Sequence, residues 1–363
     1  MSGVPPVSAD VETLLLAATS RSTQATYATA VRHYKEWCAR WGFDSHPLAV
    51  TTARALEWLA FAGPERKLMA TSLLTYRSAL STAWANAGGT GANPVQDASI
   101  SRLLAGYRNQ RYARDVEARA QRQETIALTV ELLAEIEPSA PGARGGTPDD
   151  IMLWAAACML TFGLNRCGEI FRSTRSGRPP IFACAIKFFD HQHASIVREL
   201  NSGNWQDAAA PSLYSVALGQ TKADREGSNP DQRIAAVPAV RALWRWMHIR
   251  RDLGGESGAP LFAVPGELPL TRTRLFAAVA SWLGAVSGAA VAPKVTGKAF
   301  RRGGNQSLVA SGAAISELQH AGRWRGRTMP AVYSSAAADS ARGIHVSRGL
   351  GELYASAAAA CQR

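Results

Sequence analysis

Paired cysteines, long apolar runs and lysine are all scarce in this 363-residue chain. The five cysteines form no C-x-x-C pair, so neither a disulfide framework nor a zinc site is indicated, and a reducing, intracellular setting is favoured. No run approaches the ~18 apolar residues of a membrane-spanning helix, and the N-terminus has neither the basic start nor the long apolar core of a secretory signal. We therefore expect no membrane span, no metal and no cofactor.

Arginine carries most of the positive charge, because lysine supplies only six of the 40 basic residues. With 28 acidic residues the net charge is +12, which favours a polyanionic partner such as nucleic acid or an acidic membrane surface. The planar guanidinium group matches phosphate oxygens better than an ammonium group does. A hydrophobic content of 47% suffices for two ordinary globular domains and excludes a disordered chain.

The first 110 or so residues carry helical patterns separated by Gly, Pro and Asn. Further helical segments are predicted over residues 51–63, 73–88 and 99–122. In residues 20–42, apolar residues three and four apart predict one core-facing helix face. That face consists of Tyr27, Val31, Tyr34, Cys38 and Trp41.

The last of these segments, residues 99–122, carries six arginines against two acidic residues. Such a run is usually a solvated helix or linker, but this one joins two candidate domains and could bind a phosphate backbone. The candidate DNA contacts in it are Arg102, Arg108, Arg111 and Arg114.

The pattern of apolar and polar residues changes after residue 125. Residues 149–164 are almost entirely apolar in their middle, which predicts a helix buried on most sides. Residues 212–240 contain two β-prone runs around a polar turn, which predicts a hairpin with Lys222 near its tip. Helical patterns return over residues 240–252 and 273–288. The fold class is therefore mainly α with a small β-sheet or hairpin.

Four short patterns contain residues suited to phosphate chemistry. They are "GLNRCGEI" with Arg166 and Glu169, "QTKAD" with Lys222, "KAFRRGG" with Lys298 and Arg301, and the segment from Trp324 to Tyr333. Each pattern alone has an ordinary explanation, as a charged helix end, a surface charge or an aromatic residue on a helix face.

Together the four patterns resemble those of the tyrosine recombinases, or phage-integrase family. In that family a first arginine, a hairpin lysine, an H-x-x-R box, a His or Trp and a tyrosine nucleophile follow in this order. Here Arg301 and Trp324 are 23 residues apart and Trp324 and Tyr333 nine, spacings like those of the Cre-type members. One residue is inserted before Arg166. The "KAFRRGGNQSLVASG" block is similar to recombinases of eukaryotic DIRS-like and Crypton-like mobile elements.

The resemblance implies a two-domain architecture that acts on double-stranded DNA. A helical core-binding domain would span residues 1–112, a linker 113–127 and a mixed α+β catalytic domain 128–363. It further implies four identical protomers on two duplexes, with the C-terminal segment packing either on a neighbour or on its own domain. The location would be the nucleus in a eukaryote, or the cytoplasm and nucleoid in a bacterium.

The resemblance also implies a role for each matched residue. Tyr333 would attack the scissile phosphate and form a 3′-phosphotyrosyl link, while Arg166 and Arg301 would hold the non-bridging oxygens. Lys222 would protonate the leaving 5′-oxygen. Trp324 and Lys298 would add phosphate contacts, and Glu169 would support the first arginine. Further DNA-backbone contacts are expected from Arg302, Arg323, Arg325 and Arg327.

Lys298 is the main departure from the family pattern, because histidine is usual at this position of the box. Histidine can move a proton near neutral pH, whereas an ordinary lysine stays protonated and serves as a donor. A recombinase-derived protein that binds DNA without cutting it is therefore one alternative. A relative of topoisomerase IB or of the hairpin telomere resolvases is another, and a protein of the membrane surface is a third.

Overall fold

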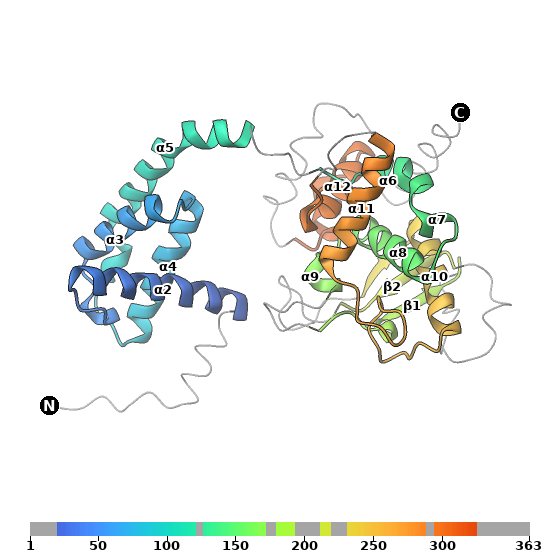
Figure 1. Cartoon of the computed structure of the whole chain (residues 1–363), viewed down its shortest axis with the longest axis horizontal. Helices are drawn as coiled ribbons and strands as arrows, with labels where there is room; N and C mark the ends of the chain where they lie inside the picture. The colour runs from blue at the N-terminus through green and yellow to red at the C-terminus, as the bar shows by residue number, and fades with distance from the viewer. Residues whose placement is uncertain are drawn as a thin grey trace. The chain divides into compact units, whose positions relative to one another are not determined.

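The structure is a computed structural model that describes residues 20–120, 126–171, 179–192, 211–218, 231–287 and 294–324. For Arg21 and residues 111–120 it describes the backbone alone. The chain divides into two compact units, the first reaching Arg122 and the second beginning at Gln123 (Figure 1).

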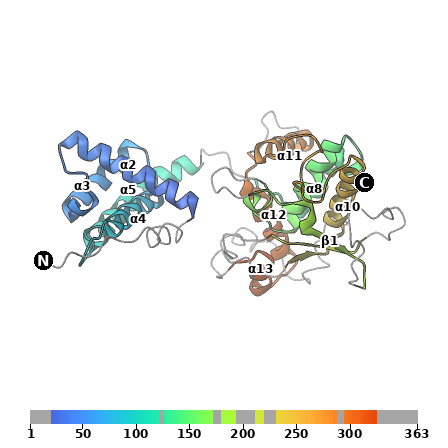
Figure 2. The ribbon, with the colours of Figure 1, turned by 90° about the horizontal axis from the view of Figure 1, so that it is seen from below.

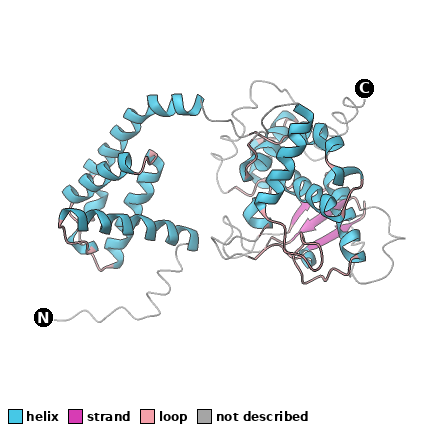
Figure 3. Ribbon diagram, viewed as in Figure 1, coloured by secondary structure: helices cyan, strands magenta, loops and turns pink. Residues whose placement is uncertain are grey.

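The first unit is helical, as its sequence predicts (Figure 3). In it α4 packs against each of the other three helices, around a core that includes the fully buried Trp58. The helix α5 runs eight residues beyond residue 112, so residues 113–120 of the expected linker are helical. The helices are α2 (Arg21–Trp41), α3 (Thr52–Glu65), α4 (Ala70–Asn86) and α5 (Ala98–Ala120), with 3₁₀ turns at Pro47–Ala49 and Pro94–Gln96.

The predicted buried face of α2 is wrong at its C-terminal end. Tyr34 is buried, but Trp41 is 56% exposed and Trp37 is buried instead. The helix stops at Gly42, whose φ of 69° is the left-handed conformation that favours glycine at a helix end. The ring centroid of Phe43, in the chain after the helix, lies 5.4 Å from that of Trp37. Phe43 therefore packs on Trp37, one turn before the end of the helix, and not on Trp41.

The second unit combines helices with a small sheet (Figure 3). Its helices are α6 (Val130–Ile136), α7 (Pro141–Arg144), α8 (Pro148–Phe162), α9 (Cys167–Ile170), α10 (Val237–Asp252), α11 (Arg272–Ser287), α12 (Gly297–Ala310) and α13 (Ile315–Ala321). Its strands are β1 (Ile186–Phe189), β2 (Leu213–Val216) and β3 (Gln232–Ile234), and 3₁₀ turns lie at Glu137–Ser139 and Ala183–Ala185.

The helix α8 forms the centre of this unit, packed against α10, α11 and α12 (Figures 1 and 2). It begins with a capping box, in which Asp150 N donates to Thr147 Oγ1 at 3.2 Å and Thr147 N donates to the Asp150 carboxylate at 3.0 Å. Every residue from Ile151 to Phe162 is buried, which confirms the prediction from the apolar run. No described helix, α8 included, is long and apolar enough to cross a membrane.

The sheet is antiparallel with the order β1-β2-β3. The pairing of β2 with β3, in which Tyr214 lies opposite Ile234, confirms the two strands of the predicted hairpin. The tip between them, including Lys222, lies outside the described residues. The strand β1 is not among the predicted strands, although Ile186 and Phe188 alternate with the exposed Lys187 as in a half-buried strand.

Candidate functional site: an arginine cluster at the end of α8

A sharp turn after α8 places Arg166. Leu164 adopts a positive φ of 46°, which is uncommon for a residue with a side chain, and Asn165 N donates to Leu160 O at 3.2 Å. Arg166 then directly precedes α9, and its backbone N–H donates to Glu169 Oε2 at 2.8 Å. Because this bond satisfies a donor at the start of the helix, Glu169 is directed back toward the arginine.

Two adjacent glycines let α12 lie close to its neighbours. A Cβ at Gly303 would lie 1.9 Å from Leu128 O, and one at Gly304 would lie 2.2 Å from Thr161 O at the end of α8. These distances are far below any real contact, so only glycine permits this approach. Arg301, three residues before Gly304 on the same helix, is 4% exposed.

Arg301 is held by the segment that follows α13. Its guanidinium group donates to the carbonyl oxygen of Gly322, and its Cζ atom lies 4.4 Å from the centroid of the Trp324 ring. This distance is within the range of a cation–π interaction. Trp324 can fold back in this way because residue 322 is glycine, where a Cβ would lie 2.0 Å from the indole ring.

Glu169 pairs with two arginines from distant parts of the chain. Its Oε1 accepts from Arg166 Nη1 at 2.7 Å, and its Oε2 accepts from Arg323 Nη2 at 2.8 Å. The Glu169 side chain is 2% exposed, that of Arg323 12% and that of Arg166 30%. Arg166 therefore reaches solvent while its partner does not.

The arginine cluster consists of Arg166, Glu169 and Arg323, together with Arg301, which contacts the residues on either side of Arg323. Burial alone would raise the pKa of Glu169, but Arg323, Arg166 and the Arg166 N–H outweigh burial and lower it. The carboxylate is therefore ionised at neutral pH. Arg166 and Arg323 both face the single carboxylate of Glu169, and this excess of positive charge favours an anion such as a phosphate group.

Arg323 was expected to contact the DNA backbone, but its guanidinium group is engaged inside the protein. Besides Glu169 it donates to Asn165 Oδ1 at 3.0 Å and to Gln232 Oε1. Asn165 and Gln232 are not among the predicted site residues. Asn165 had a signal, since it is the residue inserted before the arginine of the family motif, whereas Gln232 had none.

The other predicted site residues lie outside this cluster or outside the described residues. Lys298 is exposed in the first turn of α12, and Arg302 is half-buried on the same helix. On α5, Arg102 and Arg108 are exposed, while Arg111 and Arg114 fall where only the backbone is described. Lys222, Arg325, Arg327 and Tyr333 lie outside the described residues. The roles of all these residues stay predictions.

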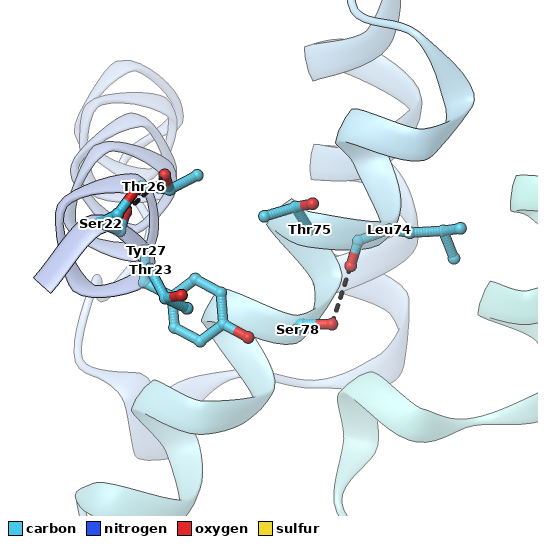
Figure 4. A pocket seen from close by; sticks show the side chains of 7 residues that line it. All are labelled: Ser22, Thr23, Thr26, Tyr27, Leu74, Thr75 and Ser78. Carbon is cyan, nitrogen blue, oxygen red and sulfur yellow. Dashed lines mark hydrogen bonds between the residues drawn. The ribbon is translucent and has the colours of Figure 1, made fainter. Parts of the chain in front are cut away.

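The first unit has a shallow hollow of its own, between α2 and α4 (Figure 4). Its volume is about 440 Å³ and hydroxyl groups line much of it. Several of these hydroxyls donate to carbonyls of their own helix, as Ser78 does to Leu74 O at 2.9 Å. The lining residues are Ser22, Thr23, Thr26, Tyr27, Leu74, Thr75 and Ser78.

Comparison with known proteins identifies the fold. No family model and no curated protein matches the sequence. Among solved structures, the chain is similar to the XerH site-specific recombinase bound to a palindromic difH substrate, with a TM-score of 0.53 and 13% identity over 87% of this chain and 76% of that one. The chain has a tyrosine recombinase fold.

Two further likenesses have lower TM-scores. A lambda integrase dimer bound to a COC′ core site gives 0.49, with 16% identity over 93% of this chain and 78% of that one. The Tn1549 transposon integrase in complex with transposon right-end DNA gives 0.48, with 14% identity over 88% of this chain and 98% of that one.

Proposed function

We propose that this chain is a site-specific tyrosine recombinase that cuts and rejoins double-stranded DNA. The observation that carries the proposal is the arginine cluster, in which Arg166 and Arg323 share Glu169 while Arg301 contacts Gly322 and Trp324 on either side of Arg323. Arg166 and Arg301 come from segments far apart in the sequence. The fold brings these segments together where Cys167 in α9 lies against Gly297 at the start of α12. A tyrosine recombinase fold with a positively charged cluster at this place is suited to holding a scissile phosphate.

The chemistry needs a nucleophile, cations and an acid. The hydroxyl of Tyr333 loses its proton to solvent as its oxygen forms a bond to phosphorus and the bond from phosphorus to the 5′-oxygen breaks. The 5′-oxygen takes a proton from Lys222, which solvent then protonates again. Arg166 and Arg301 stabilise the negative charge on the non-bridging oxygens, each by roughly 3 kcal/mol by analogy with lost oxyanion-hole donors. The 3′-phosphotyrosyl link conserves the phosphodiester bond for rejoining.

The finer parts of the proposal follow from the resemblance in sequence. Four protomers on two duplexes would exchange strands to integrate or excise a mobile element. Lys298, exposed at the start of α12, would donate a hydrogen bond to a phosphate oxygen in place of the usual histidine. A chain that only binds DNA would not need a tyrosine nine residues after Trp324.

The first prediction concerns the nucleophile. Wild-type protein mixed with nicked duplexes that carry candidate sites from the DNA flanking its gene is expected to form a protease-sensitive covalent complex. Tyr333→Phe is expected to form none, because the attacking oxygen is gone. Tyr354→Phe, which removes the hydroxyl of the next tyrosine in the sequence, is the matched control and is expected to behave as wild type.

Other outcomes would contradict this assignment in distinct ways. Equal complex formation by wild type and Tyr333→Phe would make Tyr333 the wrong nucleophile. DNA binding without any covalent complex would favour the binding-only alternative. Relaxation of supercoiled plasmid without paired sites would favour a relative of topoisomerase IB.

The second prediction concerns DNA binding by the first unit. Arg102→Gln and Arg108→Gln, both on the exposed surface of α5, are each expected to reduce the slope of log affinity against log salt by about 0.9, because each lost phosphate contact releases one counterion fewer. The control is Arg66→Gln, which removes the same charge from a side chain already 3.3 Å from Glu36. Unchanged slopes would remove these arginines from the interface.

A further inference from the structure

We propose that Arg323 is a positioning residue that assembles the site from three separate segments, an inference that rests on the proposed function for its catalytic meaning. Its guanidinium group contacts Asn165 and Glu169 around α9, and Gln232 on β3, while its own backbone lies between Gly322 and Trp324. One arginine, with a side chain 12% exposed, therefore connects the end of α8, the sheet and the segment after α13.

Each connected segment neighbours a residue with a proposed role in the reaction. The segment after α8 carries Arg166, and β3 directly follows the part of the chain that contains Lys222. The segment after α13 carries Trp324 and precedes Tyr333. A side chain that fixes these segments to one another fixes the place of Arg166 relative to Trp324, two of the groups that would have to meet one phosphate.

The acceptors around Arg323 are themselves held in place. Asn165 is fully buried, and its Nδ2 donates to Met159 O at 3.1 Å. Gln232 Nε2 donates to Gly163 O at 2.5 Å, so this side chain ties β3 to the end of α8 as well as to Arg323. The planar fork of arginine is required here, because a lysine ammonium could not reach three acceptors in these directions.

Backbone strain marks the same place. The described residues include three non-glycine positions with positive φ, and two of them, Leu164 and Arg323, bracket this network. A left-handed backbone conformation raises the free energy of any residue that has a side chain. Such a conformation therefore persists where surrounding contacts require it. Arg323, with a φ of 52°, takes this conformation while its side chain makes the three contacts.

The competing role, a contact to the DNA backbone, predicts different behaviour. A phosphate contact must reach the DNA, but the Arg323 side chain is 12% exposed and is directed toward Glu169. Loss of a phosphate contact weakens binding and reduces its salt dependence. Loss of a positioning contact leaves binding intact and slows the reaction at saturating DNA.

The test uses the full-length chain with Arg323→Lys, which keeps the charge and loses the fork. Backbone hydrogen exchange is expected to speed up together in residues 163–171, 231–234 and 322–324, and to stay unchanged in α10. On nicked DNA, the rate of covalent complex formation at saturation is expected to fall about 10- to 100-fold, with the half-saturating concentration unchanged. The control is Arg245→Lys, whose exposed arginine donates to Ala143 O at 3.4 Å, and it is expected to behave as wild type.

A second variant covers the case in which Arg323→Lys does not fold. Gln232→Leu removes one acceptor and leaves every charge in place, so it is expected to speed exchange at the same three segments and slow the reaction to a smaller extent. Exchange that changes only around residue 323 would overturn the inference. So would weaker binding with a lower salt slope and an unchanged rate at saturation.

Failure of the proposed function is distinguishable from failure of this inference. If wild type forms no covalent complex with any DNA, the proposed reaction fails. The exchange measurement still decides whether Arg323 couples the three segments, because it requires no chemistry.

Discussion

Gly303→Ala is expected to destabilise the second unit by about 3 kcal/mol or more, because the added methyl group meets backbone on which the unit depends. The Cβ would lie 1.9 Å from Leu128 O and 2.5 Å from Thr129 N. This same stretch is tied to α12 elsewhere, since Leu128 N donates to Ala299 O at 3.0 Å. The methyl group therefore cannot be accommodated by rotating a flexible side chain.

The measurement is urea unfolding of the full chain followed by far-UV circular dichroism, with the transition of each unit analysed separately. Gly284→Ala is the matched control, since Gly284 lies in α11 of the same unit and an added Cβ would meet nothing within 4 Å. That control is expected to gain roughly 0.5–1 kcal/mol, because alanine is the better helix former. Equal stability of the two variants would show that α12 does not pack this closely.

Glu169→Gln is expected to cost about 3–5 kcal/mol at neutral pH and to slow covalent complex formation, because a neutral amide leaves two guanidinium groups without their counter-charge. Glu169 is 2% exposed, so solvent cannot replace the carboxylate, and Arg166 loses its 2.7 Å contact. The measurement is chemical unfolding together with the rate on nicked DNA. Glu135→Gln, an exposed carboxylate on α6, is the matched control.

The pH dependence of this difference follows from the lowered pKa of Glu169. A carboxyl whose folded pKa lies below its ordinary value of 4.5 stabilises the fold above that pH, and the contribution disappears as pH falls through the folded pKa. The stability difference between wild type and Glu169→Gln is therefore expected to be largest at neutral pH and to shrink in acid. A difference that stays constant through the acid range would show that Glu169 is not held ionised by the arginines.

The types of element and several of their places follow from the order of the residues alone. The apolar run of α8 predicted a helix buried on most sides, because the middle of the helix carries apolar residues on every face. The paired β-prone runs predicted β2 and β3, since alternation and a polar turn act locally. Motif order likewise singled out Arg166, Arg301 and Trp324, because residue type and spacing are properties of the chain alone.

Which side chains face the core and which charges pair depends on how the elements fold together. The periodicity of α2 could not tell Trp37 from Trp41, because the choice depends on where Phe43 returns to the core. The presence of a charged residue in the sequence likewise does not show whether its side chain points toward solvent or toward the interior. Arg323 suggests a DNA contact in the sequence but turns inward in the fold, because Glu169, more than 150 residues earlier, supplies a buried carboxylate for it.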